Sequence, residues 1–137
     1  MRFENFNIEM YERVYELWKI CGITLGSSDT RDQIERVLDY SSDLFFVGIE
    51  DSEIIAVVIG AFDGRRGYVH HLAVDPKVQK KGYGRLMMQE LHKKFKERKI
   101  HKVHLFIEAD NEGVIEFYKK VGWHTREDLK MMSYVPQ

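Results

Sequence analysis

The chain has 137 residues, of which 44% are hydrophobic, and its formal net charge is −1 at pH 7. This composition suits one domain over residues 1–137 with a real core. The net charge is not basic and the sequence contains no nucleic-acid-binding motif, which excludes a typical nucleic-acid-binding protein. The longest apolar run, residues 54–62, is too short to cross a membrane and the N-terminus lacks the pattern of a signal peptide, so we expect a cytoplasmic protein.

The first half of the chain combines two helices with four strands. Apolar residues recur at helical spacing up to Cys21, the only cysteine. Thr30 followed by Gln33 is typical of a capping box, which starts a second helix. The elements expected in this half are, in chain order, a strand over 2–8, a helix over 10–21, a loop over 22–29, a helix from 30, and antiparallel strands over 44–50, 54–62 and 68–74.

The second half begins with a crossover. A helix over about 84–98 separates the strand that ends at residue 74 from a strand over 102–108, and this order implies a parallel pair of strands. A helix over 111–121 and a final hairpin, with strands over 123–126 and 129–134, complete the chain. The predicted fold class is therefore α+β, with a mixed, mostly antiparallel sheet flanked by about four helices.

The stretch from Val74 to Arg85 is the strongest functional signal in the chain. A β-branched strand runs into a basic turn with glycines at positions 82 and 84, and a long helix follows. Glycine lets the main chain approach a ligand, and the first N–H groups of a helix have no partner within it, so this pattern indicates an anion site. A Walker loop does not fit, because Leu86 stands where a hydroxyl is needed, and neither does a dinucleotide fingerprint. The remaining alternative is the start of an ordinary surface helix.

Charge is unevenly distributed around this turn. Residues 1–62 contain five basic and twelve acidic side chains, a balance of −7, whereas residues 76–104 contain ten basic and two acidic, a balance of +8. The basic side chains beside the turn would attract a polyanionic cofactor, and the acidic half would favour a cationic acceptor. The basic residues from 93 to 99 are better explained as the solvated face of a helix.

A second motif runs from Asn111 to Tyr118, beyond the next strand. In this order, the two motifs resemble those of the GNAT acetyltransferase superfamily. Its phosphate loop, Gln/Arg-x-x-Gly-x-Gly/Ala, is matched from Gln79 to Gly84, and its later helix, Asn-x-x-small-x-x-aromatic-Tyr, is matched from Asn111 to Tyr118. The order of elements is similar to the GNAT fold over essentially the full length. Residues 23–40 and the turn from Phe62 to Tyr68 look most like its YpeA/RimI-like branch.

The resemblance implies that acetyl-CoA is the cosubstrate and that residues 1–137 form a single N-acetyltransferase domain. The pyrophosphate would lie on loop amides, the pantetheine arm along the backbone of the preceding strand, and Tyr118 would be the general acid that protonates the departing thiolate. Asn111 would contact the cofactor, cap its helix, or both. The cofactor-binding residues that the resemblance implies are Leu72, Ala73, Val74, Gln79, Lys80, Lys81, Gly82, Tyr83, Gly84, Arg85, Asn111 and Tyr118.

The general base is where the chain departs from the family pattern. Several relatives carry a glutamate early on the strand over 68–74, and this chain has two histidines there. His70 shares a face with Leu72, while His71 points to the opposite face, and a bulge would exchange them. Because histidine titrates near pH 6.5, His70 is the candidate catalytic base, with Glu108 as the alternative.

These features predict transfer of an acetyl group from acetyl-CoA to a primary amine by direct attack in a ternary complex. A protein α-amine, with a pKa of about 8, needs less help from a base than a lysine at about 10.4, so α-amines are favoured and small amines stay open. The alternative is a CoA-binding sensor or interaction module without catalysis. The resemblance suggests a homodimer through the C-terminal strands. No metal is expected, because His101 and His104, three apart in or beside a strand, lie on opposite faces.

Overall fold

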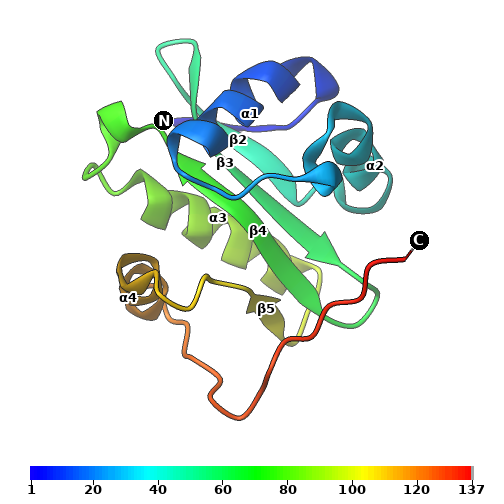
Figure 1. Cartoon of the computed structure of the whole chain (residues 1–137). Helices are drawn as coiled ribbons and strands as arrows, with labels where there is room; N and C mark the ends of the chain where they lie inside the picture. Colours follow the sequence, from blue (N-terminus) through cyan, green and yellow to red (C-terminus); the bar gives the residue numbers. More distant parts are fainter. Residues whose placement is uncertain (137) are drawn as a thin grey trace. The chain divides into compact units, whose positions relative to one another are not determined.

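In the computed structural model, which describes residues 1–136, five strands form one mixed sheet in the order β1-β2-β3-β4-β5 (Figure 1). Strands β1 to β4 are antiparallel neighbours, and β5 lies parallel to β4, as the crossover predicts. The α+β class and the mixed sheet are therefore confirmed. The bounds of the strands are β1 Arg2–Asn5, β2 Phe45–Glu50, β3 Glu53–Phe62, β4 Gly67–Val74 and β5 Val103–Leu105.

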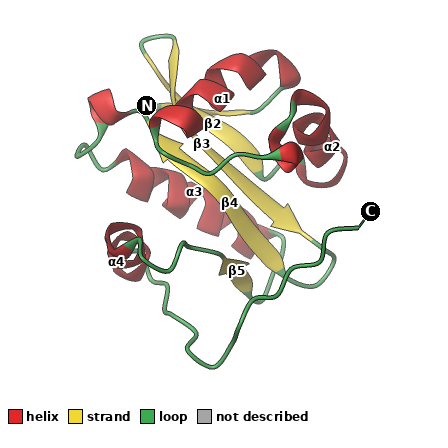
Figure 2. Cartoon of the chain, viewed as in Figure 1, coloured by secondary structure: helices red, strands yellow, loops and turns green. Residues whose placement is uncertain are grey.

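Helices and short 3-10 turns connect the strands (Figure 2). The hydroxyl of Thr30 accepts a hydrogen bond from the Gln33 N–H at 3.3 Å, which confirms the predicted start of the second helix. The bounds are α1 Tyr11–Ile20, α2 Arg31–Ser41, α3 Tyr83–Glu97 and α4 Glu112–Lys120, with 3-10 turns η1 Ile8–Met10, η2 Ser27–Asp29 and η3 Pro76–Val78.

The chain forms two compact units, Met1–Phe106 and Ile107–Gln137. The first unit contains the whole sheet with α1, α2 and α3, and the second contains α4 and the irregular segment that follows it. None of the helices within residues 1–136 has the length and apolar character that crossing a bilayer requires.

Helices α1 and α2 cover one face of the sheet, and α3 covers the other face (Figure 1). On the α1/α2 face, the core consists of side chains that alternate along the strands, because successive strand residues point to opposite faces. Full burial of one large apolar side chain contributes about 1.5–3 kcal/mol. The buried members of this core are Phe6, Tyr11, Val14, Leu17, Trp18, Ile34, Phe45, Val47, Ile49, Val57, Ile59 and Ala73.

Helix α3 lies close to the sheet because a glycine makes room for it. Met87, Leu91 and Phe95 are buried along its inner side. At Gly60 of β3, an added Cβ would lie 2.7 Å from Leu91 Cδ1 and 3.1 Å from Leu44 Cβ, closer than side-chain atoms normally approach. Glycine therefore allows α3 to lie close against the sheet at Leu91.

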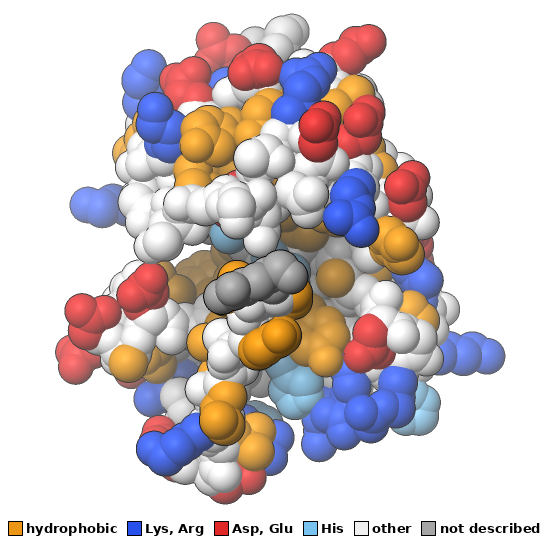
Figure 3. Space-filling view, turned by 45° about the vertical axis from the view of Figure 1, so that its right-hand side comes forward, with side chains coloured by type: hydrophobic (Ala, Val, Ile, Leu, Met, Phe, Trp, Pro, Cys, Tyr) orange, Lys and Arg blue, Asp and Glu red, His pale blue; other side chains and the backbone are white. Residues whose placement is uncertain are grey.

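The predicted C-terminal hairpin is wrong. Residues 121–136 contain no strand. A two-stranded hairpin is marginal in water unless a sheet or helix supports it. Instead, apolar side chains of this segment lie exposed at the surface, with Met132 at 93% and Tyr134 at 85% exposure (Figure 3).

Two other strand predictions are too long. The first strand ends at Asn5, because Asn7 accepts a hydrogen bond from the Glu9 N–H at 3.0 Å and starts η1. The strand predicted over 102–108 spans only Val103–Leu105. In both cases a stretch with suitable β propensity pairs with a neighbouring strand over only part of its length.

Candidate active site

Strand β4 leads into the predicted phosphate loop through a capped 3-10 turn. The Asp75 carboxylate accepts a hydrogen bond from the Lys77 N–H at 3.0 Å and forms an ion pair with Arg13 of α1 at 2.8 Å. The hydrogen bond from Lys77 and then the contact with Arg13 hold the pKa of Asp75 below its usual range. Because Asp75 is buried, this network fixes the point where the chain leaves the sheet.

The backbone enters the left-handed region twice between η3 and α3. Lys80 has a φ of 75° and Gly82 a φ of 80°. Glycine adopts this conformation without steric cost, whereas the backbone at Lys80 is strained, as is common at ligand sites. The Gln79 side chain donates to the Val74 carbonyl at 2.9 Å and ties the loop to the end of β4. Residues in alternating right- and left-handed conformations turn successive N–H groups into an anion-binding concavity.

The amide N–H groups of residues 79–85 are the unpaired donors of this loop. The first backbone hydrogen bond at the start of α3 runs from Leu86 N to Gly82 O at 3.1 Å. None of the amides over 79–85 donates to another residue within 1–136. The positive end of the α3 dipole lies at the same place, so the main chain here can bind a phosphate or diphosphate.

The side chains of the loop divide into two groups. Lys81 lies 3.6 Å from the carboxylate of Glu50 at the end of β2, and the Tyr83 hydroxyl donates to the same carboxylate. Lys80 and Arg85 are exposed, and neither forms an ion pair within the described part of the chain. Lys81 and Tyr83 therefore hold the loop to β2, while the other two cations can reach an anionic ligand.

Past its first three residues, the β4 edge that faces β5 is open. Strand β5 pairs with β4 only along residues 67–69. Because the Asp75 N–H donates to β3, alternation directs the backbone groups of Leu72 and Val74 to the open side and those of Ala73 toward β3. The Val74 carbonyl already accepts the glutamine side chain of the loop. Of the three β4 residues predicted for the pantetheine arm, Leu72 is therefore the one that faces the open side without the side-chain hydrogen bond that the Val74 carbonyl accepts.

A bulge in β4 changes the faces of its two histidines. His71 and Leu72 stand opposite a single residue of β3, and His71 has a φ of 51°. His70 lies opposite Ile59 of the α1/α2 core, and the His71 ring contacts Trp18 of α1 with centroids 5.0 Å apart. Both histidines therefore lie on the α1/α2 face. The prediction that they point to opposite faces is wrong, because the bulge inserts one residue.

Asp29 is the candidate residue that sequence reasoning missed. It is buried at the end of η2, where Oδ2 accepts from the Gly26 N–H at 2.9 Å and Oδ1 lies 2.7 Å from His71 Nε2. Its backbone carbonyl accepts from the Tyr11 hydroxyl at 2.6 Å. No local pattern signals the pair, because Asp29 and His71 are 42 residues apart. The one signal available was an acidic residue in the loop directly before α2.

His70 has a different environment from His71. Its ring stacks on Tyr68 with centroids 6.4 Å apart, and no described residue forms a hydrogen bond with its imidazole. Surrounding protein atoms and then the neighbouring His71 lower the pKa of His70, although part of the residue is exposed to solvent. The lowered pKa favours the neutral imidazole of His70, but nothing described fixes which ring nitrogen carries the hydrogen.

The second motif forms the start and body of α4 in the second unit. The Asn111 side chain accepts from the Val114 N–H at 3.3 Å, so Asn111 is the N-cap. Tyr118 is buried, and its ring lies 5.1 Å from that of Phe117 and 5.8 Å from that of Trp123. Burial raises the pKa of the Tyr118 phenol, which keeps it protonated at neutral pH.

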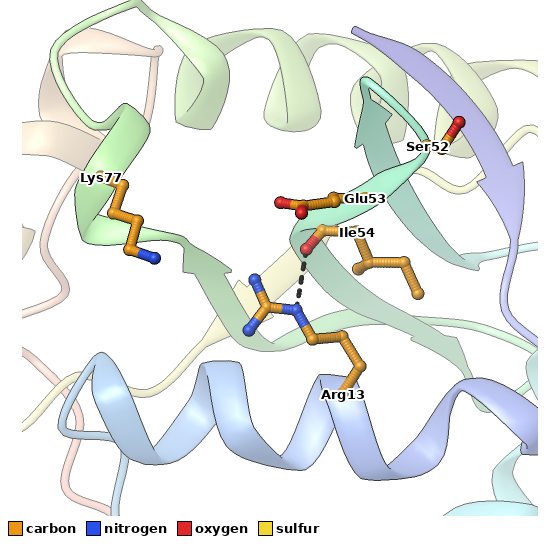
Figure 4. Close-up of a pocket in the computed structure, with 5 residues that line it drawn as sticks. All are labelled: Arg13, Ser52, Glu53, Ile54 and Lys77. Carbon is orange, nitrogen blue, oxygen red and sulfur yellow. Dashed lines mark hydrogen bonds between the residues drawn. The ribbon is translucent and has the colours of Figure 1, made fainter.

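An open hollow of about 460 Å³ lies beside η3 (Figure 4). Its lining residues are Arg13, Ser52, Glu53, Ile54 and Lys77. Arg13 donates to the Ile54 carbonyl at 3.1 Å and pairs with Asp75, so its guanidinium links α1 to β3 and to the N-cap of η3. Lys77 and Glu53 point into the space from opposite sides, which gives the hollow one free charge of each sign (Figure 4). We assign it no ligand.

Comparisons of the amino-acid sequence agree with this geometry. Residues 10–123 match the model of the acetyltransferase (GNAT) family. An acetyltransferase of Pectobacterium atrosepticum is 34% identical over 125 residues, which cover 91% of this chain and 89% of that protein.

Two solved structures have a similar fold. The PaiA N-acetyltransferase from Thermoplasma acidophilum, in complex with coenzyme A, aligns with a TM-score of 0.82 at 18% identity, covering 92% of this chain and 91% of that one. The ribosomal-protein-S18-alanine N-acetyltransferase from Escherichia coli aligns with a TM-score of 0.74 at 16% identity, covering 88% of this chain and 76% of that one. At these identities the likeness shows a shared fold.

Proposed function

This chain belongs to the GNAT acetyltransferase family, and we propose that it is an N-acetyltransferase that moves the acetyl group of acetyl-CoA to a primary amine. The observation that carries the proposal is the series of unpaired amide N–H groups over residues 79–85 at the start of α3. The family match runs through both compact units, which supports one catalytic domain over residues 1–137.

In the proposed complex, main-chain groups bind most of the cosubstrate. The loop amides hold the pyrophosphate, and the charges of Lys80 and Arg85 add to this attraction. The pantetheine arm, which is rich in amides, pairs with the open edge of β4 at Leu72 and Val74 like an added strand. The structural relative from Thermoplasma acidophilum was determined with coenzyme A, which supports this choice of cosubstrate.

The chemistry needs a base for the amine and an acid for the thiolate, within one ternary complex. An ammonium has no lone pair, so the acceptor must lose a proton before its nitrogen attacks the thioester carbonyl. One of the two β4 histidines takes this proton, and the strand pattern points to His70. Tyr118 protonates the departing thiolate, and its raised pKa keeps the phenol protonated until then.

The proposed acceptor is a protein α-amine or a small amine. An α-amine with a pKa of about 8 is partly neutral at pH 7 and needs only a weak base such as histidine. The acidic balance of residues 1–62 favours a cationic acceptor. The E. coli structural relative acetylates a ribosomal protein alanine by its name, which supports the α-amine and the YpeA/RimI-like branch. The homodimer stays a prediction, although the C-terminal strands through which it was expected are absent from residues 121–136.

Release of free thiol from acetyl-CoA in the presence of an amine panel tests the proposal. The panel contains peptides with different N-terminal residues, N-acetylated peptides with one lysine, and small amines. We expect thiol release with at least one class, above a control without amine, and a matching mass increase of the acceptor.

The contrary outcome is equally specific. If acetyl-CoA raises the melting temperature, because it binds the folded state, but no amine releases thiol, the protein is a CoA-binding sensor and the enzymatic proposal is wrong. If acetyl-CoA changes neither melting temperature nor thiol release, the assignment of the loop is wrong as well.

A further inference from the structure

The two β4 histidines differ in how the protein holds them, and this difference identifies the base. We propose that His71, oriented by Asp29, removes the proton from the acceptor amine, in place of the His70 that the strand pattern favours. The assignment rests on the proposed acetyl transfer, since it names one catalytic residue of that same reaction.

The position of His71 fits this role. It stands in the bulge next to Leu72, where the backbone groups of β4 face the open edge. The loop amides that would hold the pyrophosphate belong to the start of α3, and α3 covers one face of the sheet, whereas His71 lies on the α1/α2 face. An acyl group held at the β4 edge would therefore meet His71 from the face opposite α3.

The backbone at His71 supports a functional role. A φ of 51° places a non-glycine residue in the left-handed region, inside a strand. Strain of this kind costs about 1–3 kcal/mol and persists at sites where the surrounding structure requires it. The conformation brings the imidazole to Asp29 and Trp18, which a regular strand would not do.

Asp29 fixes the hydrogen on one ring nitrogen. An ionised carboxylate can only accept, so in neutral His71 the Nε2 carries the hydrogen and Nδ1 keeps a lone pair. Nδ1 has no hydrogen-bond partner within residues 1–136, and the side chain is 23% exposed. Asp29 pairs with no other cation among the described residues, so its charge stabilises the imidazolium that forms when His71 takes a proton.

His70 has none of these supports. No described partner selects its tautomer, and no carboxylate within residues 1–136 lies at hydrogen-bond distance from its ring. Desolvation by surrounding protein atoms and the adjacent histidine lower the pKa of His70, and the charge of Asp29 offsets this only in part.

In the proposed step, the ammonium gives one proton to His71 Nδ1. The neutral nitrogen then attacks the thioester carbon, so that a C–N bond forms and the C–S bond breaks. The departing sulfur takes a proton from Tyr118, and the second proton of the attacking nitrogen restores the phenol directly or through solvent. His71 then releases its proton to solvent, so one proton is released per acetyl group transferred from an ammonium.

Three substitutions test whether His71 acts as the base or whether its hydrogen bond with Asp29 only holds η2 to β4. His71→Asn removes the base, His70→Asn removes the competing histidine, and His101→Asn is a control at an exposed residue outside the site. Each protein is assayed with a strongly basic amine and with a weakly basic amine that is largely neutral at the assay pH. The acetyl-CoA dissociation constant and the melting temperature report on folding.

A lost base should affect the two amines differently. For His71→Asn we expect kcat to fall roughly 100-fold with the strongly basic amine and less than about tenfold with the weakly basic one, since general base catalysis contributes about 10²–10⁴. His70→Asn should lower kcat less than His71→Asn does, and by a similar factor for the two amines. The acetyl-CoA dissociation constant should stay within about threefold of the wild-type value in every variant. Loss of a structural tie alone would lower the two rates equally.

Asp29→Asn provides the sharper variant. The Gly26 N–H occupies one side-chain oxygen of Asp29, so the new amide oxygen stays there and the NH₂ faces His71. The hydrogen bond and its geometry survive, but the amide donates to Nε2 and forces the hydrogen onto Nδ1, the wrong nitrogen for the reaction. We expect kcat to fall at least tenfold with a melting temperature that changes little.

Two outcomes separate failure of the His71 assignment from failure of the proposed acetyl transfer. If the wild type releases thiol and both His71→Asn and Asp29→Asn keep turnover within threefold, the assignment to His71 is wrong and the acetyl transfer stands. If the wild type releases no thiol with any amine, the proposed function fails and the assignment fails with it. Should His71→Asn not fold, Asp29→Asn with His71 intact decides the question alone.

Discussion

The loop over residues 79–85 and the bulge at His71 both adjoin the open edge of β4, but they offer a ligand different groups. The loop offers main-chain N–H donors, and its own side chains partly serve to hold it to β2 and β4. The bulge offers a side chain, held by a carboxylate from a distant turn. A site built from backbone depends on conformation at a few positions, whereas a site built from side chains depends on residue identity.

The largest effect should come from a side chain that takes part in the chemistry. Tyr118→Phe is expected to lower kcat at least 100-fold with little change in the acetyl-CoA dissociation constant, because the substitution keeps the ring and removes only the hydroxyl that donates a proton to the thiolate. Steady-state kinetics and calorimetry measure the two quantities. Tyr40→Phe, at a residue that is 72% exposed, is the matched control and should leave both unchanged. Full turnover in Tyr118→Phe would contradict the acid role.

The next effect should come from loop conformation. Gly82→Val forces a β-branched residue into φ of 80°, at a cost of about 1–2 kcal/mol or a distorted loop, so the acetyl-CoA dissociation constant should rise about tenfold. Apart from the adjacent residues, no atom of residues 1–136 lies within 4 Å of a Cβ built there, so crowding is not the cause.

Gly64→Val is the control for that substitution. Gly64 has φ of 100° with equally open surroundings, in the turn between β3 and β4. It should lose similar stability while the acetyl-CoA dissociation constant stays the same. Equal loss of affinity in both variants would show that the loop conformation at Gly82 is unimportant for binding.

A smaller effect is expected from the network that anchors the loop. Asp75→Asn keeps the acceptor for the Lys77 N–H but loses the charge that faces Arg13, and should cost about 1 kcal/mol at pH 7. The pKa of Asp75 is lowered in the folded state, so its contribution is present above the unfolded value of about 3.9 and is lost as the pH falls through the folded value.

The free energy of unfolding as a function of pH tests this sign. Wild type and Asp75→Asn should differ by a constant amount from pH 5 to 8 and converge below about pH 3.9. A difference that grows on acidification would contradict the network described for Asp75.

The smallest effect is expected from a loop side chain. Lys81→Ala removes a cation that is 54% exposed and already 3.6 Å from Glu50, so the acetyl-CoA dissociation constant should rise less than about threefold at 0.15 M salt. Repeating the measurement at low salt should enlarge the ratio slightly. A loss larger than that of Gly82→Val would mean that the loop binds through side-chain charge more than through its backbone.

Much of the fold could be predicted because it depends on neighbouring residues. The cap at Thr30 and the glycine-containing turn are set by contacts within a few positions. The crossover joins distant strands, but the order strand, helix, strand along the chain already implies it. The C-terminal hairpin could not be judged in this way, since strand propensity creates a strand only when another strand pairs with it.

The same distinction holds for the candidate site. The loop was correctly placed between β4 and α3, and Asn111 caps α4 as one of its two predicted roles required. The faces of the histidines were predicted wrongly, because a single inserted residue reverses the alternation and no local signal marks it. The close approach of Leu91 to Gly60, which leaves no room for a Cβ, could not be predicted from local sequence either.

The sequence by itself determined which segments form helices and strands in most of the chain, and where a turn with unpaired amides stands, because backbone conformation follows from adjacent residues. Tertiary structure decided that His71 meets Asp29 and that both β4 histidines share the α1/α2 face. Those contacts join residues that lie far apart along the chain, and only the packing of α1, η2 and the β4 bulge brings them within hydrogen-bond distance.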